Sequence, residues 1–230
     1  MINTFRLLVC IAGIVCILPH TVFPKVEAGF RGGLNSTTNS LQAYVTAHGR
    51  YKDEIFDLQL DGGYGFLSLA DRFTSEHNAV FDMDYRLTDW FEAYLMTGYR
   101  FRNEVYAIES GLGGKYTYFR DTLWDLSLSL MPMYTWDLPA AGGQATAFRL
   151  SFRHRLIVKF FDNKLQLRSA VFYKPDALDF RDYIVQAAHV FSLKVTDLVS
   201  VTAGHDFYYR RRDYYSKLSL GFTFEFDGKK

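Results

Sequence analysis

The sequence predicts an all-β protein: a single antiparallel transmembrane β-barrel of about twelve strands, with ten possible and with short turns at one end. Three observations lead to this prediction. Polar and apolar residues alternate over long segments, turn-forming residues recur at steady intervals, and the chain has 16 Tyr and 21 Phe but only 5 Pro. Long strands favour aromatic residues and accept few prolines.

The N-terminal segment 1–28 is typical of a secretory signal peptide. Arg6 is the only charge before an apolar run from Leu7 to Leu18, and Val26 and Ala28 place a small residue at each of the two positions that signal peptidase reads. An apolar run of about 12 residues is too short for a spanning helix, which needs about 20. We therefore expect a signal peptide at 1–28 and a barrel at 29–230, with a retained N-terminal anchor as the alternative.

Cysteine content and charge narrow the class of protein further. Cys10 and Cys16 both lie in the expected signal peptide, so disulfide bonds play no part in the barrel. Neither lies in a lipoprotein-like context. The chain balances 26 Lys and Arg against 25 Asp and Glu, which gives no reason to expect a nucleic-acid partner.

The clearest alternation runs from Ala145 to Phe160. The even positions are almost all apolar, whereas the odd positions include three arginines and a lysine. A strand shows this pattern when its two faces meet different solvents. Strands of soluble domains average about five or six residues, but this segment stays in phase for about sixteen, which is long enough to cross a membrane at a tilt.

Turns divide the rest of the chain into similar segments. An even number of strands places both termini on the periplasmic side. A barrel of ten strands is the alternative, because residues 29–36 are rich in glycine and suit a plug or a tail. The twelve expected strands are 29–36, 39–51, 54–66, 72–87, 90–102, 105–119, 122–136, 144–160, 164–174, 180–195, 198–211 and 214–226.

Short turns that contain Asp recur once in each pair of strands. Asp, Asn and Thr form turns through bonds from side chain to backbone, and we place these turns on the periplasmic side. The longer turns at 137–143 and 174–180 then lie outside. None is long, so we expect a compact barrel without a second domain. The recurring turns are 86–90, 119–123, 161–165 and 194–198.

The last expected strand carries the most specific signal. Ser219, Gly221, Phe224 and Phe226 follow a pattern that resembles the signal by which the outer-membrane assembly machinery recognises its clients. In this chain four further residues follow Phe226, whereas the usual signal ends on a terminal Phe. We therefore expect a location in the bacterial outer membrane, with the assembly machinery and outer-membrane lipids as partners; the sequence does not predict an oligomeric state.

Several stretches share their order with a known family. Gly33–Ser40 lies at the place of a Thr-rich first turn, Tyr85–Asp89 and Tyr99–Phe101 match a middle hairpin, and Ser110–Tyr116 matches a Gly-Leu-Gly strand. Over most of 30–226 the chain resembles the salt-stress-induced outer-membrane barrels typified by YdiY, a domain-of-unknown-function family. The resemblance implies a barrel fold, an outer-membrane location and a role in stress, but no assigned activity.

If the apolar faces contact lipid, the polar faces line the lumen, and function must be sought there. Cations gather on the eighth and ninth expected strands. This arrangement predicts a basic wall that favours small polar or anionic solutes. Its members are Arg149, Arg153, Arg155, Lys159, Lys164 and Arg168.

Carboxylates gather on the third to seventh expected strands, roughly across the ring. Two opposed walls would create a transverse field that low-dielectric surroundings strengthen. The sequence therefore predicts a narrow pore; the alternative is a closed structural or stress-response barrel whose charges pair and fill the lumen. The acidic wall consists of Asp57, Asp61, Asp82, Asp84, Glu92, Glu109 and Asp125.

Catalysis has less support in the sequence. His154 and His205 project outward by parity, which leaves a lipid-modifying enzyme as a third possibility, but no serine can be assigned within reach of either ring. His48, His77 and His189 lack the spacing of a metal cluster. We therefore expect no enzyme activity, no metal and no cofactor.

Overall fold

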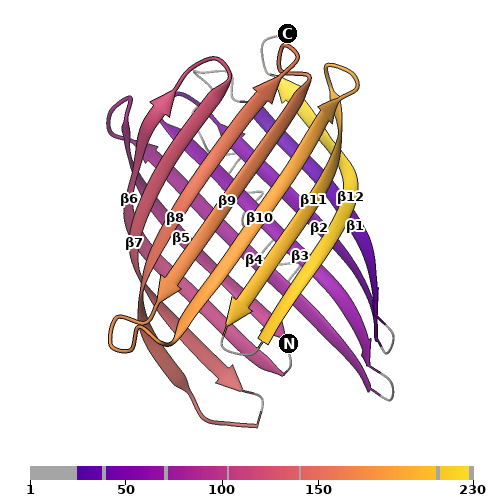
Figure 1. Cartoon of the computed structure of the whole chain (residues 1–230), viewed down its shortest axis with the longest axis vertical. Helices are drawn as coiled ribbons and strands as arrows, with labels where there is room; N and C mark the ends of the chain where they lie inside the picture. Colours follow the sequence, from indigo (N-terminus) through magenta and orange to yellow (C-terminus); the bar gives the residue numbers. More distant parts are fainter. Residues whose placement is uncertain are drawn as a thin grey trace, which may run out of the picture.

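The computed structural model describes residues 25–37, 40–69, 72–102, 104–139, 141–210 and 213–227. These residues form one closed antiparallel barrel in which each strand pairs with its neighbours in the chain and β1 pairs with β12 (Figure 1). The described residues contain no helix long and apolar enough to cross a membrane. The strands are β1 Lys25–Thr37, β2 Ser40–Lys52, β3 Phe56–Leu69, β4 Arg72–Arg86, β5 Phe91–Arg102, β6 Val105–Arg120, β7 Trp124–Pro139, β8 Ala145–Phe160, β9 Leu165–Pro175, β10 Tyr183–Lys194, β11 Val199–Arg210 and β12 Asp213–Asp227.

The predicted twelve-strand barrel is confirmed, and the ten-strand alternative is wrong. The glycine-rich segment that suited a plug belongs to β1, which pairs with β2 along its whole length and closes the barrel against β12. β1 begins at Lys25, so the expected boundary between residues 28 and 29 falls inside a strand. Residues 1–24, with both cysteines, lie outside the described residues, and the signal peptide stays a prediction.

The expected Asp turns lie at the end of the barrel that holds the start of β1 and the end of β12, which we call the terminal end (top in Figure 1). Asp121 Oδ1 accepts hydrogen bonds from the backbone N–H groups of Leu123 and Trp124, at 2.7 and 2.6 Å. In two other turns the threonine before the aspartate takes this role. Thr88 and Thr196 each accept a hydrogen bond at 3.0 Å from the first residue of the next strand.

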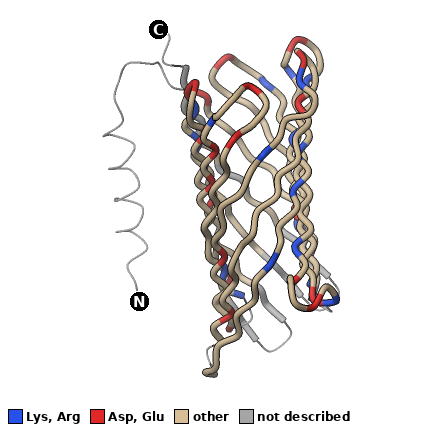
Figure 2. The backbone as a smooth tube through the Cα atoms, turned by 90° about the vertical axis from the view of Figure 1, so that its left-hand side faces the viewer, with Lys and Arg blue, Asp and Glu red and all other residues tan. Residues whose placement is uncertain are grey.

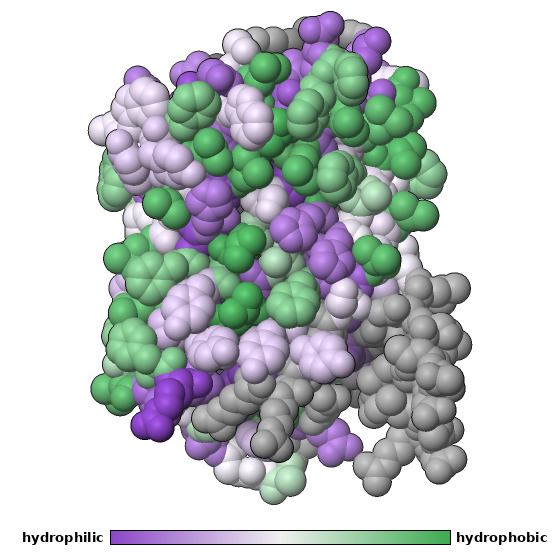
Figure 3. Space-filling view, viewed as in Figure 1, coloured by the Kyte–Doolittle hydropathy of each residue, from purple (hydrophilic) through white to green (hydrophobic). Residues whose placement is uncertain are grey.

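The outer surface of the barrel is largely apolar. Side chains that alternate along each strand point outward, and many large ones are exposed, such as Leu130, Phe152 and Leu220. Figure 3 shows this surface over the face built by β7–β12. Exposed aromatic residues lie near both ends, including Trp124 at the terminal end and Tyr134 at the opposite, distal end. Such a surface suits a bilayer with aromatic girdles at its two interfaces.

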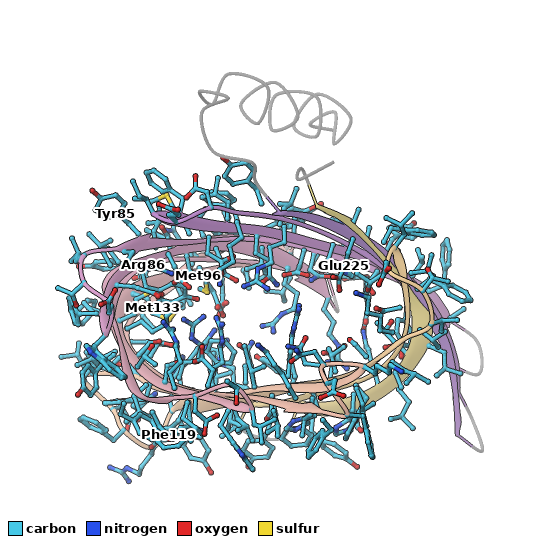
Figure 4. All side chains as sticks on the ribbon, turned by 90° about the horizontal axis from the view of Figure 1, so that it is seen from above. Tyr85, Arg86, Met96, Phe119, Met133 and Glu225 are labelled. Carbon is cyan, nitrogen blue, oxygen red and sulfur yellow. The ribbon has the colours of Figure 1, made fainter. Side chains whose placement is uncertain are left out.

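The barrel is oval in cross-section, with β6 at one narrow end (Figure 4). Gly113 makes this tight curve possible, because an added Cβ would lie 2.7 Å from the Cα of Met131 on the neighbouring strand β7. Inside the curve, four side chains from β5 and β7 form an apolar cluster within the barrel. They are Tyr94, Met96, Met131 and Met133.

Candidate functional site

The lumen contains a cavity of about 470 Å³. Its lining reaches from Glu76 and Lys174, near the distal end, to Ser200 and Glu225, near the terminal end. The view along the barrel shows this open space near the centre, whereas side chains crowd the end of the oval at which Met96 and Met133 lie (Figure 4). The lumen is therefore hollow over part of its section and filled over the rest.

Three residues of the predicted basic wall line this cavity. Arg153 and Arg155 lie on the inner face of β8, and Arg168 lies on the inner face of β9. Alternation along β8 places the side chains of Arg153 and Arg155 inside, because the intervening residues, such as Phe152, are exposed on the outer surface. These three cations give one side of the cavity its positive charge.

The other three members of that wall lie elsewhere. Arg149 is fully buried near the distal end, and Lys159 lies on the inner face of β8 near the terminal end, outside the cavity lining. Lys164 is exposed in the turn between β8 and β9. The expected place of Lys164 in the lumen is therefore wrong, because β9 starts one residue later, at Leu165.

The predicted acidic residues lie on the inner faces of β3 to β7. Asp61, Asp82 and Glu109 line the cavity. Asp57, Asp84 and Glu92 lie near the terminal end, where they take part in the ion pairs described below. Asp125 lies at the start of β7 and accepts a hydrogen bond from Arg120 at 3.1 Å.

The two predicted walls are not separate. Arg153 and Arg155 each lie 4.0 Å from a carboxylate oxygen of Asp84, across the oval. Cations also lie within the acidic region, and Figure 2 shows positive and negative positions together on both sides of the barrel. The expected transverse field between two opposed walls is wrong, because inward residues of both signs interleave around the ring well beyond the two cations, Arg100 and Arg102, that the sequence places among the carboxylates.

A buried ion-pair cluster near the terminal end joins several strands. Lys115 on β6 contacts the carboxylates of Asp84 on β4 and Glu92 on β5. Nearby, Arg50 on β2 donates to Asp57 on β3, with Nε 2.7 Å from Oδ1. Sequence reasoning missed Arg50 and Lys115, although the alternation within β2 and β6 would have placed both on the inner face.

Arg153 fills the lumen beside this cluster. Its guanidinium carbon lies 3.9 Å from the centre of the Tyr94 ring, and its nitrogens donate to Ser129 Oγ at 3.1 and 3.2 Å. Tyr94 in turn donates to Asp82 at 2.6 Å. A stacked cation in low-dielectric surroundings is held firmly, so Arg153 braces β8 against β4 and β5.

At the distal end, the loop between β9 and β10 is fixed to the barrel. Arg149 donates to the carboxylate and to the backbone carbonyl of Asp182, both at 2.9 Å. Arg210 donates to Asp137 at 2.7 Å and lies 3.6 Å from Asp182. Lys174 donates to Glu109 at 2.7 Å. These bonds hold the rim of the lumen in one arrangement.

The residues of the expected assembly signal all belong to β12. Ser219 and Gly221 lie on its inner face, whereas Phe224 is exposed on the outer face. The backbone of Phe226 pairs with Val26 of β1. Among the described residues, no group of three or more His, Cys, Asp and Glu is placed to hold a metal ion.

No protein-family model and no curated protein matches the sequence. Solved structures do share the architecture. The NanC porin gives a TM-score of 0.54 at 10% identity over 89% of this chain and 99% of that chain. The KdgM porin in complex with disordered oligogalacturonate gives 0.52 at 10% identity over 87% and 99%. An outer membrane channel from Pseudomonas putida F1 gives 0.55 at 9% identity over 90% and 97%. At such low identity these similarities show the fold alone.

Proposed function

We propose that this protein is a bacterial outer-membrane barrel that forms a narrow pore for small polar solutes, with a preference for anions. The charged lumen cavity of about 470 Å³ is the observation that carries this proposal. Eight of the residues that line it are Arg or Lys and six are Asp or Glu. Low-dielectric walls strengthen the field of this cationic surplus within the cavity.

The proposed location draws on the apolar outer surface, the aromatic residues near both ends and the expected signal peptide. Outer-membrane lipids are then the surrounding solvent, and the assembly machinery would recognise β12. Two of the similar structures are porins and a third is a channel, which supports a pore. Membership of the YdiY-like family and a role in salt stress follow only from the resemblance of sequence motifs.

A closed structural barrel is the second candidate, and the ion pairs across the lumen favour it. Arg153 and Arg155 reach Asp84 from the opposite side of the oval, and Lys115 fills the space between two carboxylates. In that case the charges would seal the interior, and the protein would act as a passive envelope component under stress. The expectation that no serine lies within reach of the outward histidines is wrong for His205, whose Nε2 lies 2.8 Å from Ser216 Oγ. An enzyme is still not proposed, because no carboxylate or amide orients this ring among the described residues, and His154 bonds to Tyr118.

Planar-bilayer conductance separates the pore from the closed barrel. We expect steady openings with anion preference from the native protein. Arg155→Gln/Arg168→Gln leaves six cations against six carboxylates in the lining, so the preference for anions should vanish while conduction persists. Lys164→Gln, in the exposed turn, is the matched control and should conduct as the native protein does.

A silent bilayer from a folded, heat-modifiable barrel would refute the pore and leave the structural candidate. An unchanged anion preference in the double variant would refute the role given to the two arginines.

A further inference from the structure

A row of four polar side chains crosses the outer surface of β9–β12, near the middle of β9, β10 and β11 and near the start of β12. Ser169 Oγ lies 2.9 Å from Nδ1 of His189, and His205 Nε2 lies 2.8 Å from Ser216 Oγ. Between these pairs the two imidazole rings stack, with centroids 5.7 Å apart and planes 7° from parallel. The strand register creates the row, because His189 lies directly opposite both Ser169 and His205.

This row interrupts an otherwise apolar face. Its residues share the outer side of the strands with exposed Val171, Phe191 and Leu218. Hydrophilic side chains break the apolar surface near the middle of the same face (Figure 3). If the protein spans the outer membrane as proposed, His189 and His205 lie at the depth of the lipid tails, because both are central in their strands.

The row is not fully satisfied there. Each ring uses one nitrogen for a hydroxyl, and the second nitrogen of His189 and of His205 has no hydrogen-bond partner among the described residues. Hydrocarbon offers no donor or acceptor, and a polar group without a partner in lipid carries a free-energy cost. A polar surface that contacts the row from outside would remove this cost.

We propose that this face is a dimer interface and that a second copy of the same chain covers the row. A neutral imidazole donates from one nitrogen and accepts at the other, and a hydroxyl does both, so the row is complementary to itself. Two barrels with the same orientation are related by a two-fold axis along the membrane normal. An axis that passes over the stacked rings brings His189 of one copy against His205 of the second.

Small residues beside the two histidines allow the second barrel to approach closely. Ala187 and Ala203 lie two residues from the histidines on the same outer face of β10 and β11. In membranes, small residues and hydrogen-bonding side chains replace the hydrophobic effect as the source of association. His154, another outward histidine, differs because it lies apart from this row and bonds to Tyr118 at 2.7 Å.

Sedimentation equilibrium of the folded protein in mild detergent micelles tests the proposal. We expect a monomer–dimer equilibrium for the native protein. His189→Leu/His205→Leu should weaken it by about tenfold or more in dissociation constant, since it removes two hydrogen-bonding groups from each copy. The double variant keeps an apolar outer face, and heat-modifiable gel mobility verifies that it folds. His154→Leu is the matched control and should dimerise as the native protein does.

A native protein that is monomeric at every protein-to-detergent ratio would overturn the proposal, as would a double variant that dimerises with native affinity. The outcome is distinguishable from that of the pore, although the inference rests on the proposed location. A conducting monomer refutes only the dimer, a silent dimer refutes only the pore, and a protein absent from the outer-membrane fraction refutes the common premise.

Discussion

The two sides of the lumen are built alike but filled differently. On the side formed by β4–β8, large inward residues such as Tyr94, Met131 and Arg153 are buried against one another. On the side formed by β9–β12, Ala188, Ser192 and Thr202 face inward and line the cavity. Inward and outward residues alternate on both sides, although β6–β8 are longer than β9–β11. The size of the inward side chains therefore decides where a twelve-strand lumen is hollow.

Because of this difference, the two sides should contribute differently to stability and to conduction. On the filled side, where side chains are closely packed and ion pairs are buried, a substitution that changes side-chain volume should be costly, because voids and overpacking both destabilise a dense interior. On the open side, added volume displaces water from the cavity. We therefore expect stability to depend mainly on β4–β8 and the width of the open path to depend mainly on β9–β12, although Arg155 of β8 also faces that path.

The most severe test enlarges a residue on the filled side. In Gly113→Leu, the new Cβ would lie 2.7 Å from the Cα of Met131 and would also overlap the Leu130 carbonyl, so β6 and β7 cannot keep their pairing. We expect no folded barrel, measured as loss of the heat-modifiable band after refolding. A folded band with native urea resistance would show that the packing at β6 is not the constraint described here.

Breaking the buried ion pairs should cause a smaller but still large loss of stability. Lys115→Met leaves Asp84 and Glu92 side by side without their shared cation. Removing one partner of a buried pair costs about 3–5 kcal/mol, which should appear as a lower free energy of unfolding in urea. Lys164→Met, in the exposed turn, is the control and should change the free energy of unfolding by less than about 0.5 kcal/mol.

If Lys115→Met unfolded like the native protein, the cluster would be hydrated and the β4–β8 side would not be the stable one.

The sequence predicts the difference between the two sides of the lumen only in part. Period-two alternation yields the twelve strands and the inward face of residues such as Arg153, because burial on one face and exposure on the other set that pattern. It does not tell which inward residues meet. Lys115 reaches Asp84 from two strands away, and Arg155 reaches it across the oval. Those contacts depend on strand stagger and on the flattening of the barrel, which a single strand does not encode.

Two further differences have local causes. Of the residue types expected to form the turn bonds, threonine does so at Thr88 and Thr196, and the sequence did not tell which side chain would. The row that includes Ser169 and His189 was missed because it depends on the register between β9 and β10. A shift of one residue would turn one strand's members of that row into the lumen.

The mildest change in stability is expected on the open side, where the same kind of enlargement has a different effect. Ala188 faces the cavity from β10, opposite Ala170 and Asp206 on the adjacent strands. Ala188→Leu adds volume where the lumen is empty, so the free energy of unfolding should change by less than about 1 kcal/mol. Single-channel conductance should fall because the new side chain narrows the open path. A loss of stability as large as that of Gly113→Leu would mean that both sides of the lumen are packed alike, and the cavity would then not be the route for solutes.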